Sequence, residues 1–157
     1  MSLLLELGTY ASLCALAYVS ALVPIVNAEL LVVGAAALAG HWQGHALAVA
    51  GVVAFGQMVG KATLYWAGRG AAKIPSDRHR KAIARWGDRF SRSALAVQGL
   101  VFVSAVVGFP PFYAISLLAG TFLVNLPAFF LVGLAGRFVR FGILALAPGW
   151  LAWIRGH

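Results

Sequence analysis

The chain has 157 residues, of which 62% are hydrophobic and 10% are charged, and its formal net charge at pH 7 is +8. Ordinary soluble domains are about 45–50% apolar and about 25% charged, so this composition argues against a soluble globular protein. We expect lipid to be the solvent for most of the chain.

The first sixty residues contain no Lys or Arg, and they predict a helical hairpin followed by a membrane-spanning helix. Pro24 interrupts the apolar run and marks the hairpin tip, because proline lacks the backbone N–H that a helix uses. A polar break from Gly40 to His45 follows, and then an apolar helix over about 46–68. We define residues 10–68 as repeat 1.

Basic residues concentrate in the linker 69–93, which holds eight basic side chains and two acidic ones. Loops rich in Lys and Arg remain on the cytoplasmic side of a membrane. Ile83, Trp86 and Phe90 share one helical face, which predicts an amphipathic cytoplasmic linker. The alternative is a binding site for anionic lipid or another polyanion.

Residues 94–136 carry no charge. As one helix they would extend about 65 Å, roughly twice the hydrocarbon thickness of a bilayer, so they must turn back. Pro110 and Pro111 mark the turn, since they remove two backbone donors in a row. The arms, 94–107 and 112–126, are too short to span comfortably and predict a re-entrant hairpin.

A second spanning helix is expected over about 128–147, which completes repeat 2 (94–147), and residues 148–157 form an interfacial tail. The two hairpins match at an offset of 86 residues, where Pro24 and Gly34 correspond to Pro110 and Gly120. In each repeat the hairpin does not cross the membrane and the long helix crosses it once. Because one repeat makes a single crossing, the second repeat starts on the opposite side and is inverted relative to the first. Paired broken segments in inverted repeats indicate a transport site near the bilayer midplane. Four or five ordinary spans with proline kinks are the alternative.

Four ionisable residues fall within the apolar segments, where charge is costly and marks candidate functional sites. They are Glu29, Lys61, Arg137 and Arg140. Three cations against one acid predict an anionic ligand, and a phosphate-bearing lipid headgroup would complete the site. Glu29 either exchanges protons and gates the site or forms a structural salt bridge; Lys61 either joins the site or snorkels to the interface.

Other polar and small residues complete the prediction. Asn27 and Tyr65 are further candidates for headgroup binding, with backbone capping at the hairpin tip as the alternative role of Asn27. Close helix packing is assigned to a set of glycines: Gly34, Gly56, Gly60, Gly120 and Gly136. The GxxxG pair within this set fits packing inside the chain or, as the alternative, a homo-oligomer.

These residues, in this order and spacing, resemble the DedA family, also called VTT-domain or SNARE-associated membrane proteins. The resemblance covers roughly residues 20–147. It rests on the acidic first hairpin, the proline-tipped second hairpin that ends in LLAG, and two arginine-bearing elements, GxxxG-x4-Tyr-x2-GlyArg and GRFVRF. It implies a lipid transporter of the bacterial inner membrane that moves undecaprenyl phosphate or a glycerophospholipid, often in dependence on the proton gradient.

The sequence therefore predicts a multi-pass, all-α protein of the bacterial cytoplasmic membrane with two re-entrant hairpins in an inverted repeat. The predicted function is that of a flippase or scramblase for an anionic lipid. We expect no enzyme activity, because enzymes acting on lipid phosphates need clustered carboxylates or a nucleophile with its base. We expect no cofactor, no metal and no nucleic-acid partner. The alternative function is a membrane-protein assembly or envelope-integrity factor that transports nothing.

Overall fold

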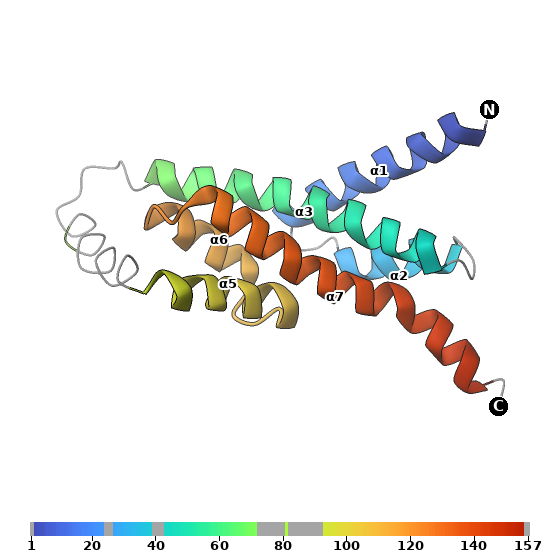
Figure 1. The fold of residues 1–157 in the computed structure, drawn as a ribbon. Coiled ribbons are helices and arrows are strands. Elements are labelled where there is room, and N and C mark those ends of the chain that lie inside the picture. Colours follow the sequence, from blue (N-terminus) through green and yellow to red (C-terminus); the bar gives the residue numbers. More distant parts are fainter. Residues whose placement is uncertain (1, 24–26, 39–42, 72–80, 82–92, 156–157) are drawn as a thin grey trace. The chain divides into compact units, whose positions relative to one another are not determined.

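The computed structural model describes residues 2–23, 27–38, 43–71, 81 and 93–155. These residues fold into helices and contain no strand, which confirms the predicted all-α class (Figure 1). The helices are α1 (Ser2–Leu22), α2 (Ala28–Leu38), α3 (Gln43–Ala71), α5 (Ala94–Val107), α6 (Phe112–Thr121) and α7 (Leu126–Arg155). Pro24 and most of the predicted linker 69–93 lie outside the described residues.

Two helices in the described part of the chain are long and apolar enough to cross a membrane. Their apolar stretches run over His45–Gly70 in α3 and Leu126–Ala147 in α7. Both include the helices predicted at about 46–68 and 128–147. Helix α7 continues through Pro148 to Arg155, because a proline within a helix removes only one donor and need not end it.

The chain divides into two compact units, and α3 and α7 each contribute to both. Unit 1 comprises Met1–Gly60 and Arg137–His157, and unit 2 comprises Lys61–Gly136. Unit 1 therefore holds α1, α2, the first part of α3 and the second part of α7. Unit 2 holds the remainder of these two long helices together with α5 and α6.

In unit 1, α1 packs closely on α3 at two of the predicted packing glycines. A Cβ added to Gly56 would lie 2.5 Å from the Cys14 carbonyl oxygen, and one added to Gly60 would lie 2.5 Å from the Cβ of Ala21. Small residues allow two helix backbones to approach in this way. Helix α2 packs beside α1, so the two helices on either side of Pro24 are neighbours.

In unit 2, α5 and α6 pack against each other across the turn at the two prolines. Helix α5 ends at Gly108, whose φ of 85° is a left-handed conformation that glycine adopts without strain, and the Gly108 N–H donates to the Ser104 carbonyl oxygen. The hydroxyl of Ser104 donates to the Pro110 carbonyl oxygen at 2.6 Å. Pro111 caps α6, and its carbonyl oxygen accepts from the Ala114 N–H at 2.9 Å.

Glycines also bring the helices of unit 2 together. A Cβ on Gly120 of α6 would lie 1.9 Å from the Tyr65 carbonyl oxygen of α3, and one on Gly68 would lie 2.1 Å from the Leu117 carbonyl oxygen. Helix α5 approaches α7 at Gly136, where a Cβ would lie 2.6 Å from that of Ala105. Each of these contacts depends on the absence of a side chain.

The two units follow the same pairing pattern. The first helix of each pair packs on the long helix that follows it, α1 on α3 and α5 on α7. The second helix contacts the other long helix, through the Glu29–Arg140 ion pair between α2 and α7 and through Gly120 between α6 and α3. The predicted packing role of Gly34 has no such contact, since a Cβ there would have nothing within 4 Å among the described residues.

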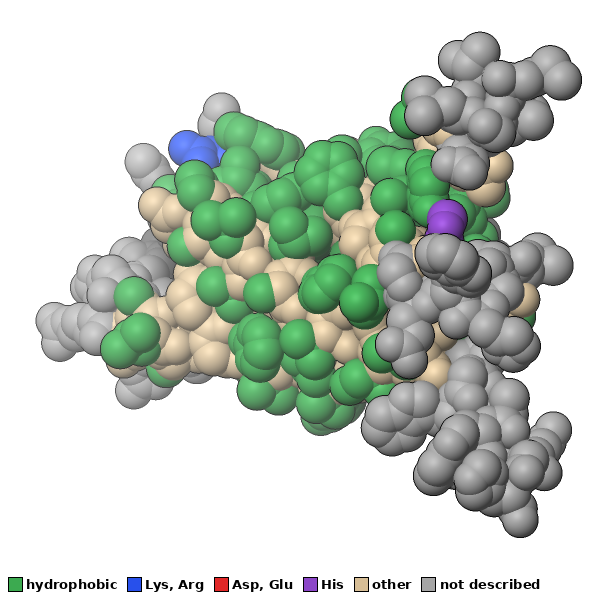
Figure 2. Space-filling view, turned by 45° about the vertical axis from the view of Figure 1, so that its right-hand side comes forward, with side chains coloured by type: hydrophobic (Ala, Val, Ile, Leu, Met, Phe, Trp, Pro, Cys, Tyr) green, Lys and Arg blue, Asp and Glu red, His purple; other side chains and the backbone are tan. Residues whose placement is uncertain are grey.

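Many large apolar side chains lie on the surface. Leu95 is 90% exposed, Phe109 74% and Leu30 71%, and some twenty others exceed one third. Figure 2 shows hydrophobic side chains making up much of the coloured face that it displays. Patches of this extent are unusual on soluble monomers and indicate contact with lipid or with partner proteins.

Candidate functional site

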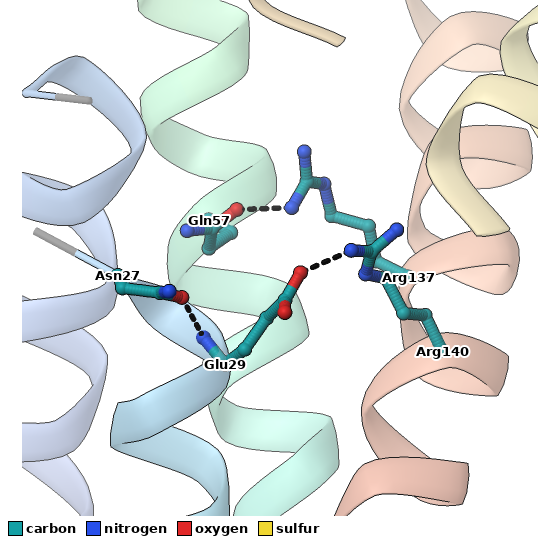
Figure 3. Close-up of polar contacts among 5 residues, drawn as sticks. All are labelled: Asn27, Glu29, Gln57, Arg137 and Arg140. Carbon is teal, nitrogen blue, oxygen red and sulfur yellow. Dashed lines mark hydrogen bonds and ion pairs between the residues drawn. The ribbon is translucent and has the colours of Figure 1, made fainter. Parts of the chain in front are cut away.

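The candidate site lies in unit 1, where Glu29 on α2 meets Arg140 on α7 in an ion pair (Figure 3). The guanidinium Nη2 of Arg140 donates to the carboxylate Oε1 of Glu29. Both side chains are partly accessible in the protein alone, 24% for Arg140 and 42% for Glu29. These two predicted residues, 111 positions apart in the sequence, are therefore brought into direct contact.

Asn27 positions Glu29 by capping the start of α2. Its side-chain Oδ1 accepts from the Glu29 backbone N–H at 2.9 Å, and its carbonyl oxygen accepts the first helical bond, from Leu31. A helix N-cap satisfies one of the donors that the first turn leaves open. The acidic side chain in that turn also interacts favourably with the positive end of the helix dipole. The capping role considered for Asn27 is therefore present in the structure.

Arg137, one turn before Arg140 on α7, contacts α3. Its Nη1 donates to the side-chain Oε1 of Gln57, and its guanidinium carbon lies 5.9 Å from the Phe141 ring centroid. Figure 3 shows both arginines directed across from α7 toward Gln57 and Glu29. The two arginines therefore have different acceptors, a neutral amide and a carboxylate.

A chain of hydrogen bonds fixes the orientation of the Gln57 amide. The Ser20 hydroxyl donates to the Ala17 carbonyl oxygen at 2.8 Å, so its single proton is used. The same hydroxyl can then only accept from Gln57, and the Gln57 Nε2 does lie 2.7 Å from it. With its nitrogen toward Ser20, the amide turns its oxygen toward Arg137. Gln57 and Ser20 are both buried, at 4% and 6% exposure.

We call Asn27, Glu29, Gln57, Arg137 and Arg140 the arginine cluster. Two guanidinium groups and one carboxylate give it one net positive charge. Guanidinium groups present several N–H donors in a planar fork that matches the oxygens of a phosphate or carboxylate. The cluster can therefore hold an oxyanion. Among the described residues, no group of three or more His, Cys, Asp or Glu is arranged to bind a metal ion.

Two other predicted headgroup ligands, Lys61 and Tyr65, belong to unit 2. Lys61 is 6% exposed, and its Nζ lies 5.4 Å from the centroid of the Tyr113 ring. Tyr65 is 1% exposed and donates its hydroxyl proton to the Val124 carbonyl oxygen at 2.6 Å, while its ring stacks on Phe129. The contacts of Tyr65 are those of a core residue.

Gln57 and Ser20 are the two site residues that the sequence analysis missed. The available signal was an amide in the middle of an apolar helix, between Gly56 and Met58. A buried polar side chain needs a hydrogen-bond partner, and in an apolar setting that requirement points to other polar residues nearby. The sequence does not say which helix supplies them.

No family model, curated protein or solved structure matches the chain. The resemblance to the DedA family therefore stays a prediction.

Proposed function

We propose that the protein spans the bacterial cytoplasmic membrane several times and moves a lipid with an anionic phosphate headgroup between the two leaflets. Two helices of sufficient length and many exposed apolar side chains support a membrane location. The pairing pattern shared by the two units supports the inverted repeat of re-entrant hairpins. The proposal includes membership of the DedA family, for which the residue resemblance is the support.

The observation that carries the proposal is the arginine cluster itself. Arg137 and Arg140 lie within the apolar stretch Leu126–Ala147, where even the lowest estimates put the cost of a charge at about 2.5–3.5 kcal/mol near the midplane. One carboxylate offsets one of the two positive charges. A phosphate oxyanion that enters between the helices would offset the other and would receive bidentate hydrogen bonds.

Glu29 would act as the gate in this proposal. It holds Arg140 while the site has no lipid, and it would release that guanidinium when a phosphate competes for it. Protonation of Glu29 would have the same effect, since a neutral carboxyl binds an arginine less strongly. This competition would couple lipid movement to protons.

Transport is tested with purified protein in liposomes that contain a fluorescent phosphatidylglycerol, by bleaching the outer leaflet with a membrane-impermeant reductant. We expect the protected fraction to fall in the wild type and to stay near one half in protein-free vesicles. Arg137→Ala and Arg140→Ala should each slow exchange about tenfold, the effect of losing one charge-assisted contact. Arg69→Ala, which removes a cation of unit 2 that stacks on Trp66, is the matched control and should leave exchange unchanged.

The Glu29–Arg140 pair also favours a second candidate, a membrane-protein assembly or envelope-integrity factor in which these charges only hold helices together. That candidate predicts that Glu29→Gln lowers thermal stability and that wild-type vesicles exchange lipid no faster than empty ones. Exchange at the empty-vesicle rate would contradict the transport proposal.

A further inference from the structure

Gln57 gives Arg137 an acceptor without charge, whereas α2 gives Arg140 a carboxylate. A glutamate at position 57 would have the same length and would hold Arg137 more strongly, because charge-assisted hydrogen bonds exceed neutral ones. It would also bring the net charge of the cluster from one positive to zero. The neutral amide therefore keeps a positive charge in the cluster that a carboxylate would cancel.

The remaining hydrogen bonds fix the orientation of the Gln57 amide. Gln57 is buried, and its nitrogen is committed to Ser20, whose own proton goes to the Ala17 carbonyl oxygen. Only the oxygen is left to face Arg137. Anchoring one guanidinium nitrogen of Arg137 to a fixed amide gives the planar group a defined orientation.

We infer that Gln57 is a positioning residue that orients Arg137 and, by being neutral, keeps one net positive charge in the arginine cluster for the oxyanion of a phosphate. The inference deepens the proposed function and rests on it for the lipid as the source of that phosphate. The recognised chemistry, a phosphate oxyanion, is shared by a lipid headgroup and by free inorganic phosphate.

Binding is measured first, because it does not require transport. The shift in thermal unfolding temperature of the purified protein in uncharged detergent is followed with short-chain phosphatidylglycerol, inorganic phosphate or an uncharged diacylglycerol. We expect phosphatidylglycerol to raise the unfolding temperature of the wild type and diacylglycerol to have no effect. In Gln57→Glu the apparent affinity for phosphatidylglycerol should fall about tenfold or more.

A second variant separates charge from geometry. The double substitution Gln57→Glu with Glu29→Gln moves the negative charge from α2 to α3 and restores one net positive charge. We expect it to recover most of the affinity for phosphatidylglycerol. Gln57→Leu keeps the net charge but loses the anchor, and we expect an intermediate loss. Gln98→Glu, the same change on α5 of unit 2, is the matched control and should leave the affinity unchanged.

Wild-type affinity in Gln57→Glu would overturn the inference, as would a double variant that binds no better than Gln57→Glu alone. If Gln57→Glu does not fold, the other two variants still test the inference. Unaltered affinity for phosphatidylglycerol in Gln57→Leu would contradict the positioning role of Gln57. So would a double variant that folds but does not bind phosphatidylglycerol. Inorganic phosphate that stabilises the wild type as much as phosphatidylglycerol does, but does not stabilise Gln57→Glu, would support the role of Gln57. It would also mean that the oxyanion is free phosphate from solution. That result would contradict the lipid-transport proposal and leave the role of Gln57 standing.

Discussion

Unit 1 and unit 2 use the same close approach of helices at glycine but fill the remaining space differently. In unit 1, side chains of α2, α3 and α7 meet through charged and amide groups, with Glu29 on Arg140 and Gln57 on Arg137. In unit 2, the corresponding helices meet through aromatic rings, and Phe129 stacks on both Tyr65 and Phe112.

The offset of 86 residues between the two hairpins allows the two units to be compared position by position. It relates Glu29 to Ile115, which is 7% exposed and belongs to the apolar core of unit 2. A repeated pattern of prolines and glycines thus accompanies a similar arrangement of helices, while the ion pair described above, between Glu29 and Arg140, belongs to unit 1. Within the described ranges, the two units therefore share the way their helices pair, and the arginine cluster belongs to unit 1.

The largest expected effect tests whether matched glycines of the two hairpins are equivalent. Gly120→Ala would place a Cβ 1.9 Å from the Tyr65 carbonyl oxygen, and moving a helix backbone to relieve this overlap should cost about 3 kcal/mol. Its counterpart Gly34→Ala meets open space and should stabilise by up to about 1 kcal/mol, because alanine favours helix. Thermal unfolding in detergent measures both. Equal losses in the two variants would contradict the difference that the structure shows.

A double-mutant cycle on Glu29 and Arg140 tests the ionic character of unit 1. Removing both charges, as Glu29→Gln with Arg140→Gln, should cost less than the sum of the single changes, and we expect a coupling energy of about 2 kcal/mol. The same cycle on Lys61 and Tyr113 of unit 2, as Lys61→Met with Tyr113→Leu, should give about 1 kcal/mol, the value of a cation over a ring. A coupling energy for the unit 1 pair no greater than that for unit 2 would remove the electrostatic distinction between the units.

Local signals made part of this fold predictable. The helix expected over 94–107 coincides with α5, because Gly108 and two following prolines are strong signals for the end of a helix. The two helices that are long enough to cross a membrane were predictable from the length of their mostly apolar sequence. The end of α7 was not, since Pro148 suggests an end that the helix passes through.

The candidate site was predictable only where charge itself gave the signal. Glu29, Arg137 and Arg140 stand out in apolar sequence, and the structure brings them together. Gln57 and Lys61 are four residues apart on α3, a spacing that places both on one helical face, yet the amide contacts Arg137 and the ammonium lies over the Tyr113 ring. The partner that each of these side chains contacts depends on how distant helices pack, and one-dimensional spacing does not contain that information.

The smallest expected effect concerns the two asparagine caps, which are alike in structure and should differ in function. Asn27 caps α2 through the Glu29 N–H at 2.9 Å, and Asn125 caps α7 through the Ala128 N–H at 3.0 Å. Replacing either by alanine should cost about 1 kcal/mol, because each removes one N-cap hydrogen bond.

Only Asn27→Ala should also slow lipid exchange in vesicles, since fraying of the first turn of α2 moves Glu29 away from Arg140. Asn27→Asp, which keeps a capping oxygen, should recover the stability. Asn125→Ala serves as the control with equal loss of stability and unaltered exchange. An equal loss of lipid exchange in both alanine variants would mean that exchange depends on the overall stability of the protein. The two asparagine caps would then give no evidence for a functional difference between unit 1 and unit 2.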